Sequence, residues 1–459
     1  MSQWIASNQI RADFSALMSQ MYQNEVPLYG DLIDLVEYVN ENTLEQQPQL
    51  QRQLEHTGEL PRLSQERHGA IRLGTAKELA NMRRIFAVMG MYPVGYYDLV
   101  PAGVPVHSTA FRALRADDLN ESPFRIFTSL LRLELIENQT LRQQAEQILA
   151  QREIFTETAL ALTEKFEQQG GLNAADAKQF VQEVLETFRW HTHAPVSLDV
   201  YQALHDQHRL IADVVAFKGP HINHLTPRTL DIDAVQAGMT ARGITPKAVV
   251  EGPPRRQCPI LLRQTSFKAL QEHVSFTDEE GSHTARFGEI EQRGVALTPA
   301  GRALYDQLLA QARQQLGQAP NEDNAHRYMQ ILEQNFRAFP DDYLTLALDG
   351  LAYFYYRPVA EADLDSVDHD DLANLLRQGV VEIEPIVYED FLPVSAAGIF
   401  QSNLGEDGQG HYQTMSNQAI FEQCLGAAVV NEIELYEQTQ QRSIAACLKQ
   451  LKQNQTINY

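Results

Sequence analysis

The sequence predicts an α+β protein built around two copies of one βαβββ module that face each other. Residues 68–75 (HGAIRLGT) and residues 224–231 (HLTPRTLD) carry a histidine and an arginine at the same spacing, 156 residues apart. The same offset relates TAFRAL at 109–114 to TSFKAL at 265–270. Two fragments that repeat in one register indicate a duplicated structural unit. Each copy opens with a histidine on a predicted strand, as expected where two modules each supply a metal ligand.

The composition indicates a globular protein with ample core and room for several domains. The 459 residues are 44% hydrophobic and 21% charged, which is ordinary for a soluble protein. Thirty-seven basic residues against 60 acidic residues give a net charge of −23, so nucleic acid phosphates and anionic membranes are repelled. We therefore expect neither nucleic acid nor membrane partners, and the composition identifies no protein partner.

Cysteine usage and the lack of long apolar runs predict a cytoplasmic protein. Cys258, Cys424 and Cys447 are scattered and odd in number, which suits a reducing compartment better than a disulfide framework. The segment MSQWIASNQIRADF lacks the basic and apolar regions of a signal peptide, so we expect none. No window of the sequence is apolar for long enough to cross a bilayer.

Residues 1–66 are expected to form a helical N-terminal region, and the first module follows at 67–134. HGAIRL is its first predicted strand. Thr75 and Glu78 then form a capping box, because a threonine hydroxyl and a glutamate three residues later satisfy free N–H groups at a helix start. GYYDLV, VHSTAFRAL and FRIFTSLL are the three strands that complete the βαβββ order.

Residues 135–215 are predicted to be a helical insertion, and the second module spans 216–298. Its helix has Asp231 as the expected N-cap, and its remaining strands are KAVVEGPP, PILLRQTSFKAL and ARFGEIEQRG. Residues 299–459 are expected to be a mainly helical C-terminal region that contains one strand and loop segment at 381–403.

The alternation of strand faces selects which of the histidines can meet. His68 and Arg72 are four residues apart on one short strand and share a face, and so do their counterparts His224 and Arg228. His221 has the opposite parity to His224, so only one of the two can point into a site on that strand. The repeat selects His224.

A carboxylate completes the predicted metal site. In FGEIEQRG, Glu289 and Glu291 lie on one strand face, and parity does not choose between them. Two histidines and one carboxylate form a facial triad, which suits non-haem Fe(II) and leaves three coordination positions open. A 2-oxo acid can occupy two of these positions and O2 the third. FRIFTSLL, the matching strand of the first module, has no carboxylate, and alignment of RIFT with RFGE places Thr128 opposite Glu289.

Other polar residues are candidates for binding the substrate. An anion-binding role is favoured for Arg72, which shares a strand face with His68, whereas a structural ion pair is favoured for Arg228. Val394 and Ser395 lie in a small-residue loop whose backbone N–H groups are able to hold a carboxylate. An ordinary tight loop is the alternative interpretation of that segment.

Two motifs resemble those of known metalloenzymes. A paired βαβββ module with a histidine on the first strand and a glutamate on the last resembles the vicinal oxygen chelate superfamily. INHLTP at 222–227 is similar to the strand that carries a metal histidine in 4-hydroxyphenylpyruvate dioxygenase and hydroxymandelate synthase. EIEQRG at 289–294 is similar to their E-x-x-Q-R stretch, in which the first glutamate is the ligand. This comparison favours Glu289, with Glu291 as the alternative ligand.

A closer resemblance covers the chain from about residue 1 to about residue 450. RHGAIRLGT, FKGPHINHLTPRTLDID, FGEIEQRG and PVSAAGIF together resemble the bacterial 2-oxoadipate dioxygenase/decarboxylase family, also called 2-hydroxyglutarate synthase. The resemblance implies Fe(II) held by His68, His224 and Glu289. It also implies that Arg72 binds the substrate, with the Val394–Ser395 loop nearby.

The resemblance implies an enzyme of lysine breakdown that acts on a 2-oxo dicarboxylate and O2. The implied reaction is the Fe(II)- and O2-dependent oxidative decarboxylation and intramolecular hydroxylation of 2-oxoadipate to 2-hydroxyglutarate and CO2. Two other functions are alternatives. One is an O2-independent divalent-metal isomerase or lyase of the glyoxalase type, which consumption of oxygen would exclude. The other is a non-catalytic protein that binds a small anion or metal, which turnover would exclude.

Overall fold

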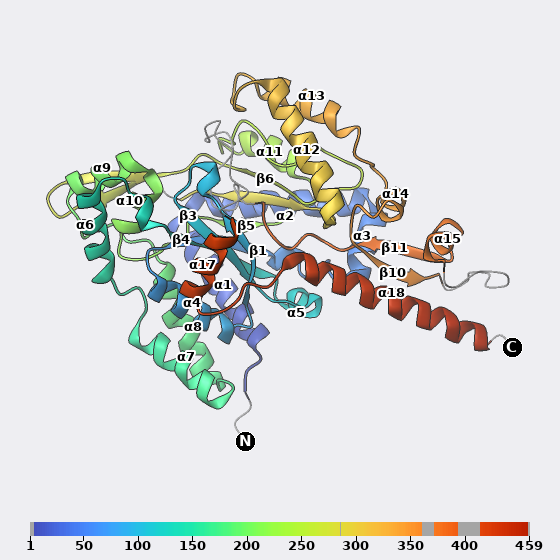
Figure 1. The fold of residues 1–459 in the computed structure, drawn as a ribbon, viewed down its shortest axis with the longest axis horizontal. Helices are drawn as coiled ribbons and strands as arrows, with labels where there is room; N and C mark the ends of the chain where they lie inside the picture. Colours follow the sequence, from blue (N-terminus) through green and yellow to red (C-terminus); the bar gives the residue numbers. More distant parts are fainter. Residues whose placement is uncertain (1–3, 285, 360–370, 393–413, 458–459) are drawn as a thin grey trace.

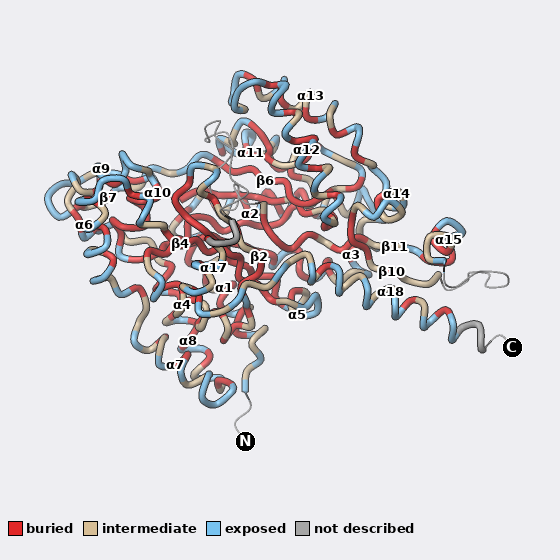
Figure 2. Tube along the Cα trace, viewed as in Figure 1, coloured by how far each residue is buried: buried red, intermediate tan, exposed pale blue. Residues whose placement is uncertain are grey.

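The computed structural model describes residues 4–284, 286–359, 371–392 and 414–457, and it has the mixed α+β architecture that the sequence predicts. Strands lie at the middle of the molecule, and helices surround them (Figure 1). The central strands are almost wholly buried, whereas the outer helices expose one side to solvent (Figure 2). None of the helices in these residues has both the length and the apolar character needed to span a bilayer. Cys258, Cys424 and Cys447 are free thiols.

A five-stranded sheet contains the first predicted module. Its strands are β1 (Arg67–Leu73), β2 (Tyr92–Asp98), β3 (Val106–Arg112), β4 (Phe124–Leu131) and β5 (Leu225–Pro227), in the spatial order β2-β3-β4-β1-β5. Strand β1 is parallel to β4 and antiparallel to β5, so the start of the second module joins the edge of the first. Helix α4 (Ala76–Val88) follows β1 and begins at the predicted capping box of Thr75 and Glu78.

Residues 216–298, the predicted second module, form a helix, the two-stranded sheet β6–β9 and one hairpin that was not predicted. Helix α11 (Ile232–Ala241) has Asp231 as its N-cap, and β6 (Leu262–Ser266) is antiparallel to β9 (Glu289–Arg293). The predicted strand at 247–254 is reduced to isolated bridges, one of which joins Glu251 to Gln264. The hairpin of β7 (Gln271–Ser275) and β8 (Glu280–Thr284) was not predicted, because its strands are polar and largely exposed.

The observed register corrects the expected alignment of Thr128 with Glu289. Ala110 pairs with Phe127 in the first module, and Ser266, its counterpart 156 residues later, pairs with Glu289 in the second. Phe127 is therefore the counterpart of Glu289, one residue before Thr128. A slip of one residue exchanges the faces of a strand. The expected alignment matched Arg125 of RIFT with Arg286 of RFGE, and the observed pairing differs from that match by one residue.

Helices make up most of the remaining chain. The N-terminal region forms α1 (Ser7–Glu25), α2 (Pro27–Gln46) and α3 (Pro48–His56). The insertion forms α6 (Gln139–Ala150), α7 (Glu157–Gln169), α8 (Ala174–Leu185), α9 (Leu198–Gln207) and α10 (Arg209–Val215), and a further short helix, α5 (Ala116–Glu121), precedes β4. Short 3-10 helices lie at Leu63–Gln65, Val100–Ala102, Leu133–Leu135 and Glu186–Phe188.

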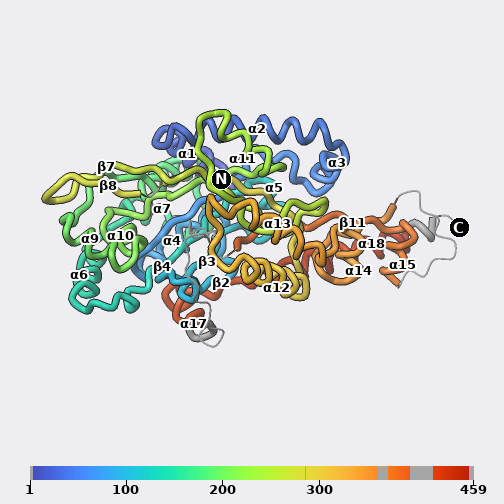
Figure 3. The backbone as a smooth tube through the Cα atoms, turned by 90° about the horizontal axis from the view of Figure 1, so that it is seen from above, coloured from blue at the N-terminus to red at the C-terminus, as the bar shows by residue number. Residues whose placement is uncertain are grey.

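The C-terminal region combines helices with a small sheet. Its helices are α12 (Pro299–Leu316), α13 (Ala325–Phe336), α14 (Tyr343–Leu348), α15 (Leu372–Arg377), α17 (Thr414–Leu425) and α18 (Glu432–Ile457). Strand β10 (Phe354–Pro358) pairs with β11 (Val381–Pro385), which begins the predicted segment at 381–403; the rest of that segment from residue 393 is outside the described residues. Hairpin β7–β8 lies beside α9 and α10 at one end of the molecule, whereas α15 and α18 lie at the other end (Figure 3).

Candidate metal centre

Two neighbouring strand segments bring His68 and His224 together. His68 is the second residue of β1 and pairs with Thr226 of β5, so His224 lies just before the strand that adjoins β1. Gly69 permits this close approach, because a Cβ atom there would lie 2.4 Å from the Ile222 side chain and 3.1 Å from the His224 carbonyl oxygen. The ring centroids of the two histidines are 5.5 Å apart, with their planes almost perpendicular.

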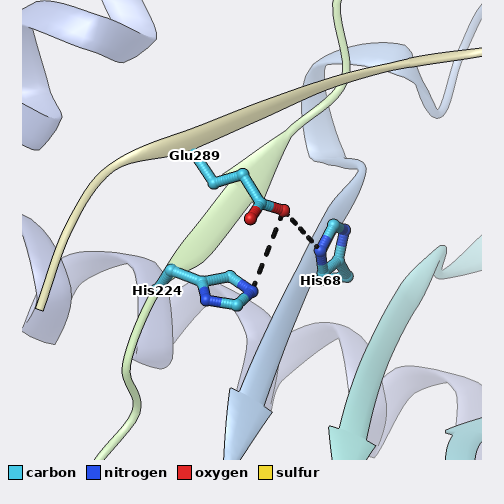
Figure 4. A group of neighbouring side chains, drawn as sticks. All are labelled: His68, His224 and Glu289. Atoms are coloured by element: carbon cyan, nitrogen blue, oxygen red, sulfur yellow. Dashed lines mark hydrogen bonds and ion pairs between the residues drawn. The ribbon is translucent and has the colours of Figure 1, made fainter. Parts of the chain in front are cut away.

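Glu289 approaches both histidines from β9 (Figure 4). Its Oε1 atom lies 3.1 Å from His68 Nε2 and 3.9 Å from His224 Nε2. One ligand atom from each of the three side chains lies within 4.8 Å of the others, and all three side chains are fully buried. We call this set the His–His–Glu cluster. It contains the two histidines selected by the repeat and by strand parity.

The chemistry of the cluster fits a divalent metal. Neither ring nitrogen of His224 has a hydrogen-bond partner among the described residues, and neither does Glu289 Oε2. Burying such polar atoms without partners is costly, so one ring nitrogen of His224 and Glu289 Oε2, grouped with His68 in a buried cluster, suit a bound cation. Burial lowers the pKa of the His224 ring to about 4 despite the nearby Glu289 charge, so the ring is neutral as a metal ligand must be.

Two uncharged side chains orient Glu289. The Thr226 hydroxyl donates to Glu289 Oε1 at 3.1 Å, and the Gln264 amide donates to the same oxygen at 2.8 Å. These bonds leave Oε2 without a partner and fix the plane of the carboxylate. Sequence analysis did not identify either residue, because the repeat does not preserve its type: the counterparts 156 residues earlier are Ala70 and Ser108.

Glu291 lies on the other side of His68 from Glu289. Its Oε2 atom is 3.0 Å from His68 Nδ1, whereas Glu289 faces Nε2 of the same ring. Arg293 donates to both oxygens of Glu291, at 2.7 and 2.9 Å. Burial would raise the pKa of the Glu291 carboxyl, but Arg293 and His68 outweigh it and lower the pKa to about 2. This is the arrangement by which a carboxylate orients a metal-binding histidine through its second nitrogen.

Aromatic rings and a tyrosine hydroxyl enclose the cluster. Phe391 packs edge-on against His68 with ring centroids 4.9 Å apart, and Phe287 packs against His224 at the same separation. The Tyr22 hydroxyl of α1 lies 3.0 Å from the Asn223 carbonyl oxygen and 2.8 Å from the Phe287 carbonyl oxygen, so its proton is shared between them. The N-terminal helix therefore holds the two segments that carry His224 and Glu289.

Arg72 lies at a cavity of about 500 Å³ that adjoins the cluster. Phe287, which packs against His224, lines the same cavity. The Arg72 guanidinium donates to Asp213 at 2.6 Å, and His283 Nε2 lies 2.9 Å from the other oxygen of Asp213. Arg72 therefore reaches the cavity already paired with one buried carboxylate, which the sequence did not predict.

The other candidates lie elsewhere. His221 Nε2 is 3.2 Å from Asp213 and is not part of the cluster, as strand parity predicted. Arg228 forms buried ion pairs with Glu59 at 2.7 Å and with Glu66 at 3.2 Å, which agrees with the structural role favoured for it. Val394 and Ser395 lie outside the described residues.

The chain is similar to proteins of one named family over nearly its whole length. The model of the 2-oxoadipate dioxygenase/decarboxylase family matches residues 14–403. The 2-oxoadipate dioxygenase/decarboxylase of Pseudomonas putida is 61% identical over 455 residues, which is 98% of each chain. That of Escherichia coli K12 is 56% identical over 451 residues, 97% of this chain and 99% of the relative. A crystal structure of hydroxyglutarate synthase from P. putida in complex with 2-oxoadipate superposes with a TM-score of 0.92 at 60% identity, covering 98% of this chain and 100% of that one.

Proposed function

This chain belongs to the 2-oxoadipate dioxygenase/decarboxylase family, and from that premise we propose that it converts 2-oxoadipate and O2 to 2-hydroxyglutarate and CO2. The atoms balance, because the 1-carboxylate of the substrate leaves as CO2, one atom of O2 enters the new carboxylate at the former keto carbon, and the other becomes the hydroxyl group. The proposal is supported by the similarity to relatives that carry this name and by the buried His–His–Glu cluster. That cluster is the single observation in the structure that carries the proposal. We assign the reaction to lysine breakdown on the family resemblance.

We propose that His68, His224 and Glu289 hold one Fe(II) ion. Fe(II) in a facial triad would chelate the carboxylate and keto oxygens of a 2-oxo acid and activate O2 beside them. Glu289 serves as the ligand rather than Glu291, because Glu289 has an oxygen without a partner whereas Arg293 and His68 engage both oxygens of Glu291.

The protein residues supply orientation and a dry site. Glu291 and Arg293 fix the ring of His68 through Nδ1, and Thr226 and Gln264 fix the carboxylate of Glu289. The Phe391 and Phe287 rings exclude water from the histidines, which strengthens every electrostatic interaction inside the site. Arg72 faces the adjoining cavity, where we propose that it receives the distal carboxylate of the substrate.

We also propose that the two predicted modules, 67–134 and 216–298, are a structural duplication. In the first module, β1 is parallel to β4, and β3 is antiparallel to β4. In the second, Arg228, just after β5, forms a parallel bridge with Glu291 of β9, and β6 is antiparallel to β9. The regions 1–66, 135–215 and 299–459 surround this pair. The duplication accounts for the convergence of two histidines from equivalent strand positions on one site.

An oxygen-electrode assay tests the proposed function. The protein is loaded with Fe(II) under nitrogen and then mixed with air-saturated buffer and a panel of 2-oxo dicarboxylates. We expect one O2 consumed for each 2-oxoadipate, with 2-hydroxyglutarate and CO2 as products. Turnover of a substrate without oxygen uptake would favour the isomerase or lyase, and binding of 2-oxoadipate without turnover would favour a binding protein.

A further inference from the structure

The cavity beside the His–His–Glu cluster gathers positive charge in a strongly acidic protein. Arg72, Arg209 and Lys247 line it, and Asp213 is the single carboxylate among its described lining residues. Three basic side chains and one carboxylate line it, in a chain whose net charge is −23. Like charges that are held close together destabilise a protein, so such a cluster indicates a site for an anion.

The pair of Arg72 and Asp213 contributes geometry to this cavity but no net charge. Asp213 accepts from Arg72 at 2.6 Å, and both side chains are more than nine-tenths buried. Burial would raise the pKa of the Asp213 carboxyl, but His221 and Arg72 hold it well below its usual range, so the carboxylate stays ionised. A carboxylate that arrives beside Arg72 therefore meets a guanidinium whose charge is already balanced.

Three elements hold that pair in a defined orientation. His283 of hairpin strand β8 lies 2.9 Å from Asp213 through Nε2 and 2.8 Å from the Tyr201 hydroxyl of α9 through Nδ1. If Nε2 carries the proton and donates to Asp213, Nδ1 accepts from Tyr201, and every group in the chain is satisfied. The hairpin lies beside α9 and α10 (Figure 3), and the helical insertion and the hairpin meet at Arg72 through Asp213 of α10.

Arg209 is the cation that this arrangement does not neutralise. It begins α10, four residues before Asp213, and lines the cavity with Arg72. Arg209 is exposed and lines the cavity, whereas Asp213, the carboxylate among the described lining residues, is paired with Arg72. Burial lowers the pKa of Arg209 and the Arg72 charge lowers it further, whereas the Asp213 charge raises it.

We infer that Arg209 supplies the net positive charge that selects a second carboxylate on the substrate, whereas Arg72 supplies the orientation. Arg209 is thus a specificity-determining residue for 2-oxo dicarboxylates over 2-oxo monocarboxylates. Lys247 also lines the cavity. The inference rests on the proposed function, because it takes the substrate to be a 2-oxo acid bound at the His–His–Glu cluster.

The test compares two substrates that differ only at the distal end. 2-Oxoadipate carries the second carboxylate, and 2-oxohexanoate has a methyl group in its place. Calorimetry under nitrogen measures the binding of each to Fe(II)-loaded protein, and the oxygen electrode measures turnover. Arg209→Gln removes the charge, Arg209→Lys keeps it, and Arg327→Gln on α13 removes an exposed arginine that belongs to a different part of the molecule (Figure 1).

Arg209→Gln is expected to weaken binding of 2-oxoadipate and to raise its KM by about tenfold, the effect of one charged contact at a partly exposed position. Its affinity for 2-oxohexanoate and its kcat stay within twofold. Arg209→Lys recovers most of the loss, and Arg327→Gln changes nothing. Equal loss for both substrates, or no loss for either, would overturn the inference. Binding of 2-oxoadipate without oxygen uptake by the unmodified protein would refute the proposed function alone, since the binding arm would still decide the role of Arg209.

Discussion

Replacing Glu291 by glutamine should weaken metal binding without removing the site. The carboxylate is fully buried, lies 3.0 Å from His68 Nδ1, and accepts two hydrogen bonds from Arg293. A glutamine keeps one oxygen for Arg293 but loses the charge that orients His68. Loss of such a partner typically costs 10–100-fold in metal affinity, which is about 1.4–2.8 kcal/mol. Glu289→Gln removes a ligand instead, so its loss should be much larger.

The fold should tolerate the change in Glu291. Breaking a buried ion pair commonly costs about 3–5 kcal/mol when one charge is left alone. In the variant, Arg293 still has the Tyr388 and Asp390 carbonyl oxygens as hydrogen-bond acceptors, at 2.7 and 2.9 Å, and an ion pair with Glu66 at 3.7 Å. The loss of folding stability should therefore lie below that range. Thermal unfolding of the metal-free variant measures it separately from metal binding.

Anaerobic titration of the metal-free proteins with Fe(II) is the assay, with the exposed Glu333→Gln as the matched control. We expect Glu291→Gln to bind one Fe(II) at saturation with a Kd raised 10–100-fold. Glu289→Gln should retain no iron after gel filtration and should show no oxygen uptake with 2-oxoadipate. If Glu289→Gln keeps its iron while Glu291→Gln loses it, the roles assigned to the two carboxylates are reversed and the reasoning is refuted.

Three further predictions concern other residues. His224→Ala should abolish metal retention in a chelator-competition assay whereas His221→Ala should not, and equal loss in both would contradict the choice of His224. Arg72→Lys keeps the charge but loses the bidentate guanidinium, so KM for 2-oxoadipate should rise by the factor that corresponds to about 1.5–3 kcal/mol of lost binding free energy. Unchanged kinetics would make Arg72 structural. Burial lowers the pKa of His107 to about 4, and the Arg132 charge adds to this effect despite Glu134 and Asp98. Because unfolded His107 binds a proton near pH 6.5 and the folded form does not, the free energy of unfolding should fall by up to roughly 3 kcal/mol as pH falls from 6.5 to 4. Urea titrations of His107→Asn should show a smaller fall over this range, and an identical fall would refute this assignment.

The sequence predicted the parts of the site that follow from repetition and strand geometry. The repeat located His68 and His224 on equivalent strands, and parity separated His224 from His221, as the structure places them. Parity left Glu289 and Glu291 undecided because both lie on one face of β9. Their separate positions depend on Arg293 and on the ring of His68, which are contacts of the folded protein and leave no pattern in the sequence.

The parts that sequence analysis missed depend on contacts between distant segments. Asp213 meets Arg72 across 141 residues, and nothing in the pattern of α10 marks a carboxylate that will face a strand of the first module. Hairpin β7–β8 has few apolar residues, so strand periodicity did not identify it. Strand β10 was likewise missed within a region whose pattern is mainly helical.

Anomalous diffraction at the iron absorption edge tests the central claim most directly. Crystals of protein loaded with Fe(II) under nitrogen should give one strong peak between His68 Nε2, His224 Nε2 and Glu289, with Glu291 remaining on the far side of His68. Asp213, His221 and His283 also bring buried ligand types together, at 3.2 and 2.9 Å. A peak there, or no ordered iron between the three predicted ligands, would contradict the account.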